Sequence, residues 1–199
     1  MIYLASTSPR RRELLDQIAV PYQLLLMRNR AGRTPDVDET PLDDEPATVY
    51  VQRIAHYKAQ IGWERTKQRG LPLYPLLAAD TTVALENHIL GKPLDEDEAI
   101  HMLKMLSGQT HQVHTAVTVI YHDHIECALS STQVSIHTLN DDDICRYIQQ
   151  ESVLDKAGAY GLQGRAAAFI KHISGSDSGV KGLPLYETAQ ILSHFGIIV

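Results

Sequence analysis

The sequence has few cysteines, no long apolar run and no excess of basic residues. Its two cysteines, Cys127 and Cys145, form no Cys-x-x-Cys pair, so we expect neither a disulfide framework nor a cysteine zinc site, and a reducing cytoplasm as the location. No stretch approaches the roughly 20 apolar residues of a membrane span, and no basic leader follows Met1, so neither membrane insertion nor secretion is expected. The 18 Lys and Arg against 24 Asp and Glu give a net charge of −6, which argues against nucleic acid polymers and anionic membranes as partners.

What is present is the length and composition of an ordinary globular domain. The 199 residues are 44% hydrophobic and 21% charged, which is enough to bury a core and argues against intrinsic disorder. Strand patterns occur at residues 2–5, 76–85, 89–90, 112–121, 125–129 and 132–138, and helix patterns begin near Ser8, Pro46, Asp95, Asn140 and Pro184. The elements interleave without strict βαβ regularity, which predicts one mixed-sheet α/β domain over residues 1–199.

Three arginines follow the first predicted helix start. Ser8 suits an N-cap and Pro9 the first helical position, which places Arg10, Arg11 and Arg12 in the opening turn. The positive end of the helix dipole disfavours a cation there by roughly 0.3 to 1 kcal/mol, unless a bound anion absorbs both fields. The pattern therefore indicates a phosphate cradle, or else a helix that starts later and leaves exposed arginines.

Two charged residues interrupt otherwise apolar patterns. Asp80 lies in the middle of the run 76–85, where an ionised carboxylate is costly unless it is paired, hydrogen-bonded or bound to metal. It is either functional or caps a nearby loop. Lys58 ends the apolar helical stripe that starts at Val51, and without a partner its stem is expected to cover the stripe while its ammonium reaches water. Lys92, in a turn, indicates only solubility when taken alone.

Acidic residues and histidines admit simpler interpretations. Residues 34–45 hold no basic residue, and their acidic side chains predict a solvated loop: Asp36, Asp38, Glu39, Asp43, Asp44 and Glu45. His111 and His114 point to opposite faces of a regular strand, so they cannot share one ion. His122 and His124 share a face but sit at a predicted turn without a third ligand. We expect no zinc site.

Five segments together form a more specific pattern. They are SxSPRRxELL at residues 6–15, ADT at 79–81, GKP at 91–93, LSGxxH at 106–111 and DKAGAYGxQG at 155–164. Jointly, from residue 2 to residue 185, they resemble the Maf family of nucleoside triphosphate pyrophosphatases. The resemblance implies a mixed, curved sheet flanked by helices with a cleft between two lobes, as in inosine triphosphate pyrophosphatases. It also implies cleavage of a nucleoside triphosphate to the monophosphate and pyrophosphate, a divalent cation (Mg²⁺ or Mn²⁺) and a homodimer.

The resemblance also implies roles for individual residues. Four positions match those that bind phosphate: Ser8, Arg11, Lys58 and Lys92. Asp80 matches the catalytic acidic residue, as a base or as a metal-bound group that orients water, and Glu39 matches a position that is a metal ligand or orients water. Glu39 and Asp80 are therefore the expected metal ligands. Residues 28–37 are longer than the corresponding family segment, and the placement of Glu39 rather than Asp38 depends on that stretch. The other acids of residues 34–45 keep the interpretation of a solvated loop.

Three positions resemble the subgroup that hydrolyses dTTP and UTP. They are Arg10, Thr81 and Gln163, whereas the subgroup acting on 7-methyl-GTP has Trp, Gln and Glu there. A glutamine amide both donates and accepts hydrogen bonds, as the edge of uracil or thymine requires. The resemblance thus predicts a house-cleaning dTTP and UTP pyrophosphatase, which could also take modified pyrimidine nucleotides. The alternative is a nucleotide-sensing regulator of cell division with incidental hydrolysis.

Overall fold

A seven-stranded sheet forms the centre of the computed structural model, which describes residues 1–27, 36–86 and 88–199. The strands are β1 (Ile2–Leu4), β2 (Tyr22–Leu24), β3 (Leu76–Leu85), β4 (His88–Leu90), β5 (Thr110–Tyr121), β6 (His124–Ile136) and β7 (Ile170–Ser174). Their order is β2-β1-β3-β5-β6-β7, with β4 paired to β3. β1 is parallel to β2 and β3, and the other described pairs are antiparallel, which confirms the expected mixed sheet.

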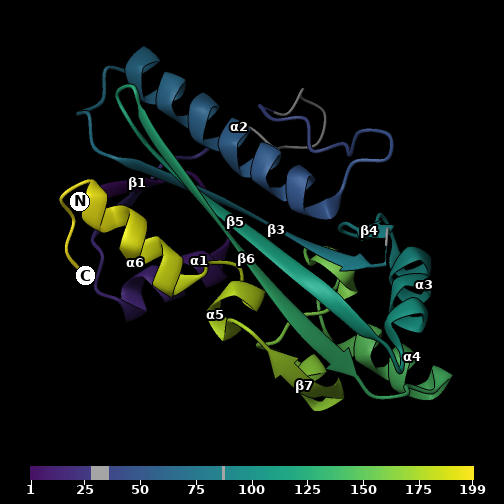
Figure 1. Cartoon of the computed structure of the whole chain (residues 1–199). Helices are drawn as coiled ribbons and strands as arrows, with labels where there is room; N and C mark the ends of the chain where they lie inside the picture. Colours follow the sequence, from purple (N-terminus) through teal and green to yellow (C-terminus); the bar gives the residue numbers. More distant parts are fainter. Residues whose placement is uncertain (28–35, 87) are drawn as a thin grey trace.

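Helices cover both faces of this sheet (Figure 1). They are α1 (Pro9–Gln17), α2 (Ala47–Gln68), α3 (Glu96–Leu106), α4 (Asp141–Gln150), α5 (Asp177–Val180) and α6 (Leu185–His194), with short 3-10 turns at Ala157–Ala159 and Arg165–Phe169. α2 lies along one face, α1 and α6 lie against the other, and α3 and α4 gather at the end of the β5–β6 hairpin remote from its turn (Figure 1). The hairpin thus joins a first lobe, around α1, α2 and α6, to a second lobe around α3 and α4.

The side-chain alternation of β3 decides which groups face which helix. Leu77 belongs to the core that α1 and α6 share, whereas Leu76 belongs to the core beneath α2. Because side chains alternate between the faces of a strand, Asp80 points to the α2 side and Thr81 to the α1 side.

The second lobe has its own core. Leu103 and Leu106 of α3 are buried together with Ile144 and Tyr147 of α4, and the start of β5 contributes Val113. Residues 153–166, which connect α4 to β7, add further buried side chains to the same core. The loop that carries the DKAGAYGxQG segment is therefore fixed to the second lobe.

Most expected boundaries are confirmed. β3 spans the predicted apolar run, and Asp95 and Asn140 each accept a 2.8 Å capping hydrogen bond at the start of α3 and α4. β4 pairs with β3 as the predicted hairpin requires, although Asn87 of its turn lies outside the described residues. The same holds for residues 28–35 of the segment expected to be longer than in the family. None of the described helices combines the length and apolar character needed to cross a bilayer.

Some details of the prediction were wrong. The runs 125–129 and 132–138 form one strand, β6, which ends at Ile136, because residues 124–135 all pair with β5. Pro46 is the N-cap of α2 rather than part of its first turn. β2 and α5 were missed, since three or four residues carry too little periodicity to be recognised.

Candidate active site

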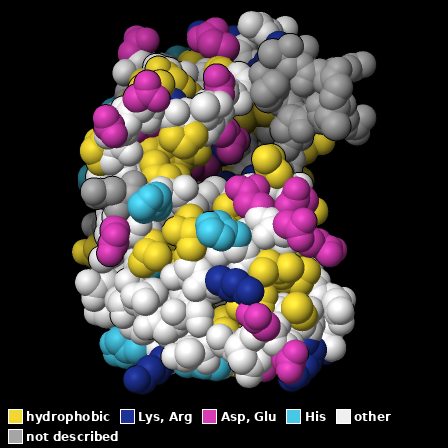
Figure 2. All heavy atoms as spheres, turned by 90° about the vertical axis from the view of Figure 1, so that its right-hand side faces the viewer, with side chains coloured by type: hydrophobic (Ala, Val, Ile, Leu, Met, Phe, Trp, Pro, Cys, Tyr) yellow, Lys and Arg dark blue, Asp and Glu magenta, His cyan; other side chains and the backbone are white. Residues whose placement is uncertain are grey.

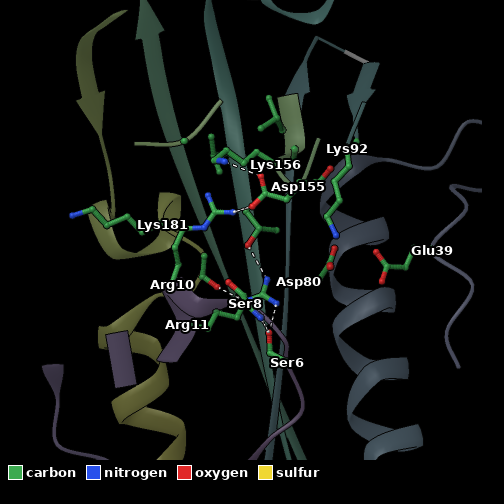
Figure 3. Close-up of a pocket in the computed structure, with 18 of the residues that line it drawn as sticks. Ser6, Ser8, Arg10, Arg11, Glu39, Asp80, Lys92, Asp155, Lys156 and Lys181 are labelled. Carbon is green, nitrogen blue, oxygen red and sulfur yellow. Dashed lines mark hydrogen bonds and ion pairs between the residues drawn. The ribbon is translucent and has the colours of Figure 1, made fainter. Parts of the chain in front are cut away.

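A cavity of about 710 Å³ opens between the two lobes. Figure 2 looks at the end of the molecule where the surface is hollowed, with acidic side chains gathered around the recess. The cavity walls come from the loop before α1, from α2, from the middle of β3 and from residues 155–163 (Figure 3). All nine site residues predicted from the sequence line it: Ser8, Arg10, Arg11, Glu39, Lys58, Asp80, Thr81, Lys92 and Gln163.

Lys58 joins two carboxylates at the centre of this cavity. Its Nζ donates a 2.7 Å hydrogen bond to Asp80 Oδ1 and lies 2.9 Å from Glu39 Oε1. Only 13% of the Lys58 side chain and 10% of the Asp80 side chain are exposed, so Lys58 does not extend into water as a partnerless lysine would. Asp80 caps no loop within the described residues; its partner is Lys58. One ammonium faces two carboxylates here, and the positive charges of Lys92 and Arg11 also act on Glu39.

Glu39 is held both by its backbone and by its side-chain carboxylate. The Tyr50 hydroxyl donates a 2.9 Å hydrogen bond to the Glu39 carbonyl oxygen, and Lys58 contacts its carboxylate. Burial acts to raise the pKa of Glu39, but the positive charges of Lys58, Lys92 and Arg11 outweigh it, and the net pKa is lowered. Glu39 is therefore ionised at neutral pH.

Two other acids of residues 34–45 are paired, contrary to the expectation of a solvated loop. Glu45 accepts hydrogen bonds of 2.7 and 2.6 Å from Arg53, and Asp36 lies 2.8 Å from Arg65. Their side chains are only 5% and 4% exposed. Both arginines belong to α2, so these pairs fasten the acidic loop to the helix that carries Lys58. Asp38, Asp43 and Asp44 are exposed, as expected, and the Glu39 side chain is 44% exposed.

α1 begins at Pro9, so the three arginines do lie in its first turn, and the alternative of a later start is wrong. Arg11 donates hydrogen bonds to the Gly182 carbonyl oxygen at 2.8 Å, to Thr81 Oγ1 at 3.2 Å and to Ser6 Oγ at 3.3 Å. These bonds fix the guanidinium at the cavity wall.

The positive charge of Arg11 and the hydroxyl of Ser8 remain for a ligand. Burial lowers the pKa of Arg11, while the carboxylates of Asp80 and Glu39 act in the opposite direction. Ser8 is the N-cap of α1, yet its side chain makes no capping hydrogen bond. Lys92 points from the end of β4 toward Asp80 and Glu39 (Figure 3). Hydroxyl, guanidinium and ammonium groups thus converge around the paired carboxylates.

The three predicted specificity residues occupy different parts of the wall. Arg10 Nη2 lies 3.5 Å from Asp155 Oδ2, and Gln163 Nε2 lies 3.5 Å from Glu13 Oε2. Both contacts connect α1 of the first lobe to the loop of the second. Thr81, by contrast, faces α1 and accepts the hydrogen bond from Arg11, so it lies on the opposite side of β3 from Asp80.

Asp80 and Glu39 are the residues of this cavity that could hold a divalent cation. Mg²⁺ is commonly bound through one or two carboxylates together with phosphate oxygens of the substrate and water. Within the described residues, no group of three or more His, Cys, Asp and Glu side chains could hold a metal ion. The two carboxylates that contact Lys58 are oxygen donors of the kind that such an ion takes.

His111 of the LSGxxH segment lies in the core and not in the cavity. It is 2% exposed, and its Nε2 lies 2.6 Å from the hydroxyl of Tyr160, which does line the cavity. Burial lowers the pKa of His111 to about 4, so the ring is neutral at physiological pH. It supports the glycine-rich loop, residues 155–164, through Tyr160.

A family model described as Maf-like protein matches residues 1–195. The chain belongs to the Maf family. A relative from Nitrosomonas europaea named dTTP/UTP pyrophosphatase is 54% identical over 100% of this chain and 96% of its own. Proteins of the same name from Aromatoleum aromaticum and Dechloromonas aromatica are 50% and 45% identical over 98% of this chain, and over 95% and 97% of their own. The Staphylococcus aureus Ham1 structure matches 68% of this chain and 71% of its own, with a TM-score of 0.47 and 14% identity.

Three residues of this Maf protein's site were not predicted as such. Tyr50 is the first buried residue of α2, one position before Val51, and this position was the available signal. The stripe that starts at Val51 was expected to end at Lys58, but it continues to Thr66. Asp155 and Lys156 belong to the segment that carried the family resemblance, but nothing in their spacing indicated a partner. The contact of Asp155 with Arg10 of α1 depends on how the two lobes meet, and Lys156 contacts Asp155.

Proposed function

We propose that this Maf protein hydrolyses dTTP and UTP, and modified pyrimidine nucleotides of similar shape, to the monophosphate and pyrophosphate. The observation that carries the proposal is the cavity in which Lys58 joins Asp80 and Glu39. Relatives that are 45% to 54% identical over nearly the whole chain bear the name of this activity. By hydrolysing modified or surplus pyrimidine nucleoside triphosphates, the protein would have a house-cleaning role.

Asp80 is the base in the proposed reaction. The oxygen of water forms a bond to the α-phosphorus, the bond from that phosphorus to the oxygen bridging to the β-phosphate breaks, and pyrophosphate leaves with the electron pair. Lys58 occupies Asp80 Oδ1, which leaves Oδ2 to accept the proton of the attacking water. Because the carboxylate is fixed by this hydrogen bond, it need not reorganise during the step.

Cationic side chains stabilise the charge that develops on the leaving pyrophosphate. Lys58, Lys92 and Arg11 all line the cavity beside Asp80, and Ser8 adds a hydroxyl at the start of α1. Phosphoryl transfer depends mainly on such positioning and charge stabilisation. These residues would hold the triphosphate with its α-phosphorus facing Asp80.

Asp80 and Glu39 would also hold a divalent cation, Mg²⁺ or Mn²⁺. When bound, the ion would neutralise charge on the triphosphate oxygens. Glu39 suits this role because it is ionised and its backbone is fixed by Tyr50. We place the reaction in the cytoplasm, because Cys127 and Cys145 are both free, as is usual in a reducing compartment.

The nucleobase of the substrate would be selected by three residues: Arg10, Thr81 and Gln163. Gln163 can donate to and accept from a uracil or thymine edge, while Arg10 can only donate. Thr81 would act by holding Arg11, with which it shares a 3.2 Å hydrogen bond. The base would then lie toward the glycine-rich loop and the phosphates toward Lys92.

A coupled assay tests the proposal. Common and modified triphosphates are incubated with Mg²⁺, with Mn²⁺ or with a chelator, and phosphate is detected by malachite green with and without added inorganic pyrophosphatase. We expect dTTP and UTP to be turned over fastest, with a signal that requires the coupling enzyme. Phosphate release without it would indicate cleavage at the γ-phosphate and contradict the proposal. Binding without turnover of any triphosphate would favour the nucleotide-sensing regulator.

A further inference from the structure

We propose that Asp155 is a positioning residue that acts through Arg10 and thereby contributes to the base preference of the cavity. The inference rests on the proposed function, because it concerns the same site. It begins from an arginine in the first turn of α1 that is paired with a protein carboxylate instead of being left for a phosphate.

Asp155 lies between two cations at the edge of the cavity (Figure 3). Its Oδ2 is 3.5 Å from Arg10 Nη2 and its Oδ1 is 2.7 Å from Lys156 Nζ. Lys156 Nζ also donates a hydrogen bond to the Ser152 carbonyl oxygen. Burial acts to raise the pKa of Asp155, but Lys156 and Arg10 lower it by more, so the carboxylate is ionised at neutral pH.

The loop that carries Asp155 is itself fixed to the second lobe. Val153 is 3% exposed in the core of that lobe, and the Lys156 amide donates a 3.2 Å hydrogen bond to the Val153 carbonyl oxygen. The Lys156 side chain is 14% exposed, so it is held against the loop. Asp155 therefore lies on a loop that is fixed to the second lobe, and it contacts Arg10 across the boundary between the lobes.

Gly161 limits Arg10 on another side. A Cβ atom at this position would lie 3.1 Å from Arg10 Nη1 and 3.1 Å from Cδ and Cε of Lys156. Such contacts are tighter than ordinary van der Waals separations, so both side chains approach the loop backbone as closely as they do because position 161 is glycine. Arg10 is held by a carboxylate at Nη2 and by this close approach at Nη1.

This arrangement changes what Arg10 offers to a nucleotide. Without Asp155, the guanidinium would be repelled by Lys156 and attracted by the triphosphate and by Asp80. With Asp155, which is 58% exposed and 3.5 Å away, its charge is compensated in part, and its remaining N–H groups act as directed donors at the nucleobase end of the cavity. Uracil and thymine present carbonyl oxygens that accept such bonds, whereas adenine has no carbonyl group. Discrimination between pyrimidine and adenine nucleotides should therefore depend on Asp155, through Arg10.

A double-mutant cycle tests this dependence. The Asp155→Asn, Arg10→Met and double variants are compared with the wild type by kcat/KM for dTTP and dATP. We expect Asp155→Asn to lower the dTTP to dATP ratio about tenfold, mainly through KM for dTTP, and to add nothing in the Arg10→Met background. An equal loss in both backgrounds, or an unchanged ratio, would overturn the proposal.

Further variants separate positioning from folding. Asp155→Glu, which keeps the charge, should restore part of the ratio, and Gly161→Ala should lower it by displacing Arg10 while Asp155 remains. Asp141→Asn removes an exposed carboxylate of the same lobe, 2.9 Å from Lys104, and should change neither ratio nor melting temperature. The inference would be contradicted if both variants were folded, Asp155→Glu restored none of the dTTP to dATP ratio and Gly161→Ala left the ratio at the wild-type value.

Binding measurements keep the inference separate from the proposed activity. If the wild type hydrolyses no triphosphate, the proposed function fails, but affinities for α,β-imido-dUTP and α,β-imido-dATP can still be measured by calorimetry. We then expect Asp155→Asn to lower the ratio of these affinities by about the same factor and only when Arg10 is present. An unaltered ratio would overturn the positioning role whatever the activity of the protein.

Discussion

Lys58 of α2 donates a 2.7 Å hydrogen bond to Asp80 in the middle of β3. The contact exists because Lys58 lies beside the buried stripe of α2, directly before the buried Ala59, and Asp80 lies on the strand face that α2 covers. Removing an ionised pair from water is costly, so a pair in this setting contributes little to stability compared with an apolar one of the same volume. Its presence on the floor of a cavity is better explained by chemistry than by folding, and each partner can be tested.

Replacement of Asp80 by Asn should nearly abolish turnover. The amide oxygen can still accept the hydrogen bond from Lys58, but an amide cannot take a proton from water, and losses of about 10² to 10⁴ are typical for a lost general base. Affinity for α,β-imido-dUTP, measured by calorimetry, should change much less than turnover. The matched variant Asp123→Asn, at the exposed β5–β6 turn, should retain wild-type kinetics. Wild-type turnover in Asp80→Asn would refute the assignment of the base.

Replacement of Lys58 by Met should destabilise the protein in a way that Mg²⁺ partly reverses. The variant leaves Asp80 and Glu39 facing each other without the ammonium between them, and removing one partner of a buried pair costs about 3 kcal/mol. A divalent cation held by the two carboxylates would compensate their charge and bind only the folded state. Urea unfolding with and without Mg²⁺ measures the effect.

The control for this experiment lies on the same helix. Lys67 forms an exposed pair with Glu64 away from the cavity, so Lys67→Met should change stability little and should respond to Mg²⁺ as the wild type does. If Mg²⁺ stabilised Lys58→Met no more than Lys67→Met, the two carboxylates would not be the ligands of the ion.

The sequence allowed the local features of this site to be predicted, but not the contacts between segments. Asp80 stood out because its own strand is apolar, and the first-turn arginines because α1 has clear start signals. Glu45 and Asp36 looked solvated because their partners lie 8 and 29 positions away on α2. Asp155 is 145 residues from Arg10, and no periodicity relates two such positions. That Glu39 and Lys92 join Asp80 followed only from the family resemblance, since each is individually an ordinary loop residue.

Replacement of Gln163 by Glu should lower the preference for dTTP and UTP over purine nucleotides. An ionised glutamate only accepts hydrogen bonds, so it cannot donate to a carbonyl oxygen of uracil or thymine. The same change places a second carboxylate beside Glu13, whose Oε2 lies 3.5 Å from Gln163 Nε2. The variant should therefore be compared with Gln163→Glu made in a Glu13→Gln background, which removes the repulsion. A wild-type substrate profile in both would contradict the role of Gln163.

Acid should destabilise the protein through His111. Burial lowers its pKa from 6.5 to about 4, so the unfolded chain takes up the proton more readily than the folded one. The resulting loss of free energy of unfolding is absent above about pH 7, grows as the pH falls through 6.5 and reaches its full size near pH 4, up to about 3 kcal/mol.

His111→Gln should be less stable than the wild type at neutral pH, because it changes the group that contacts Tyr160. Between pH 7 and pH 4.5, however, it should lose less stability than the wild type does, as measured by urea unfolding at both values. His101→Gln, at an exposed position of α3, should keep the wild-type pH dependence, and the same dependence in His111→Gln would show that His111 is not buried in its neutral form.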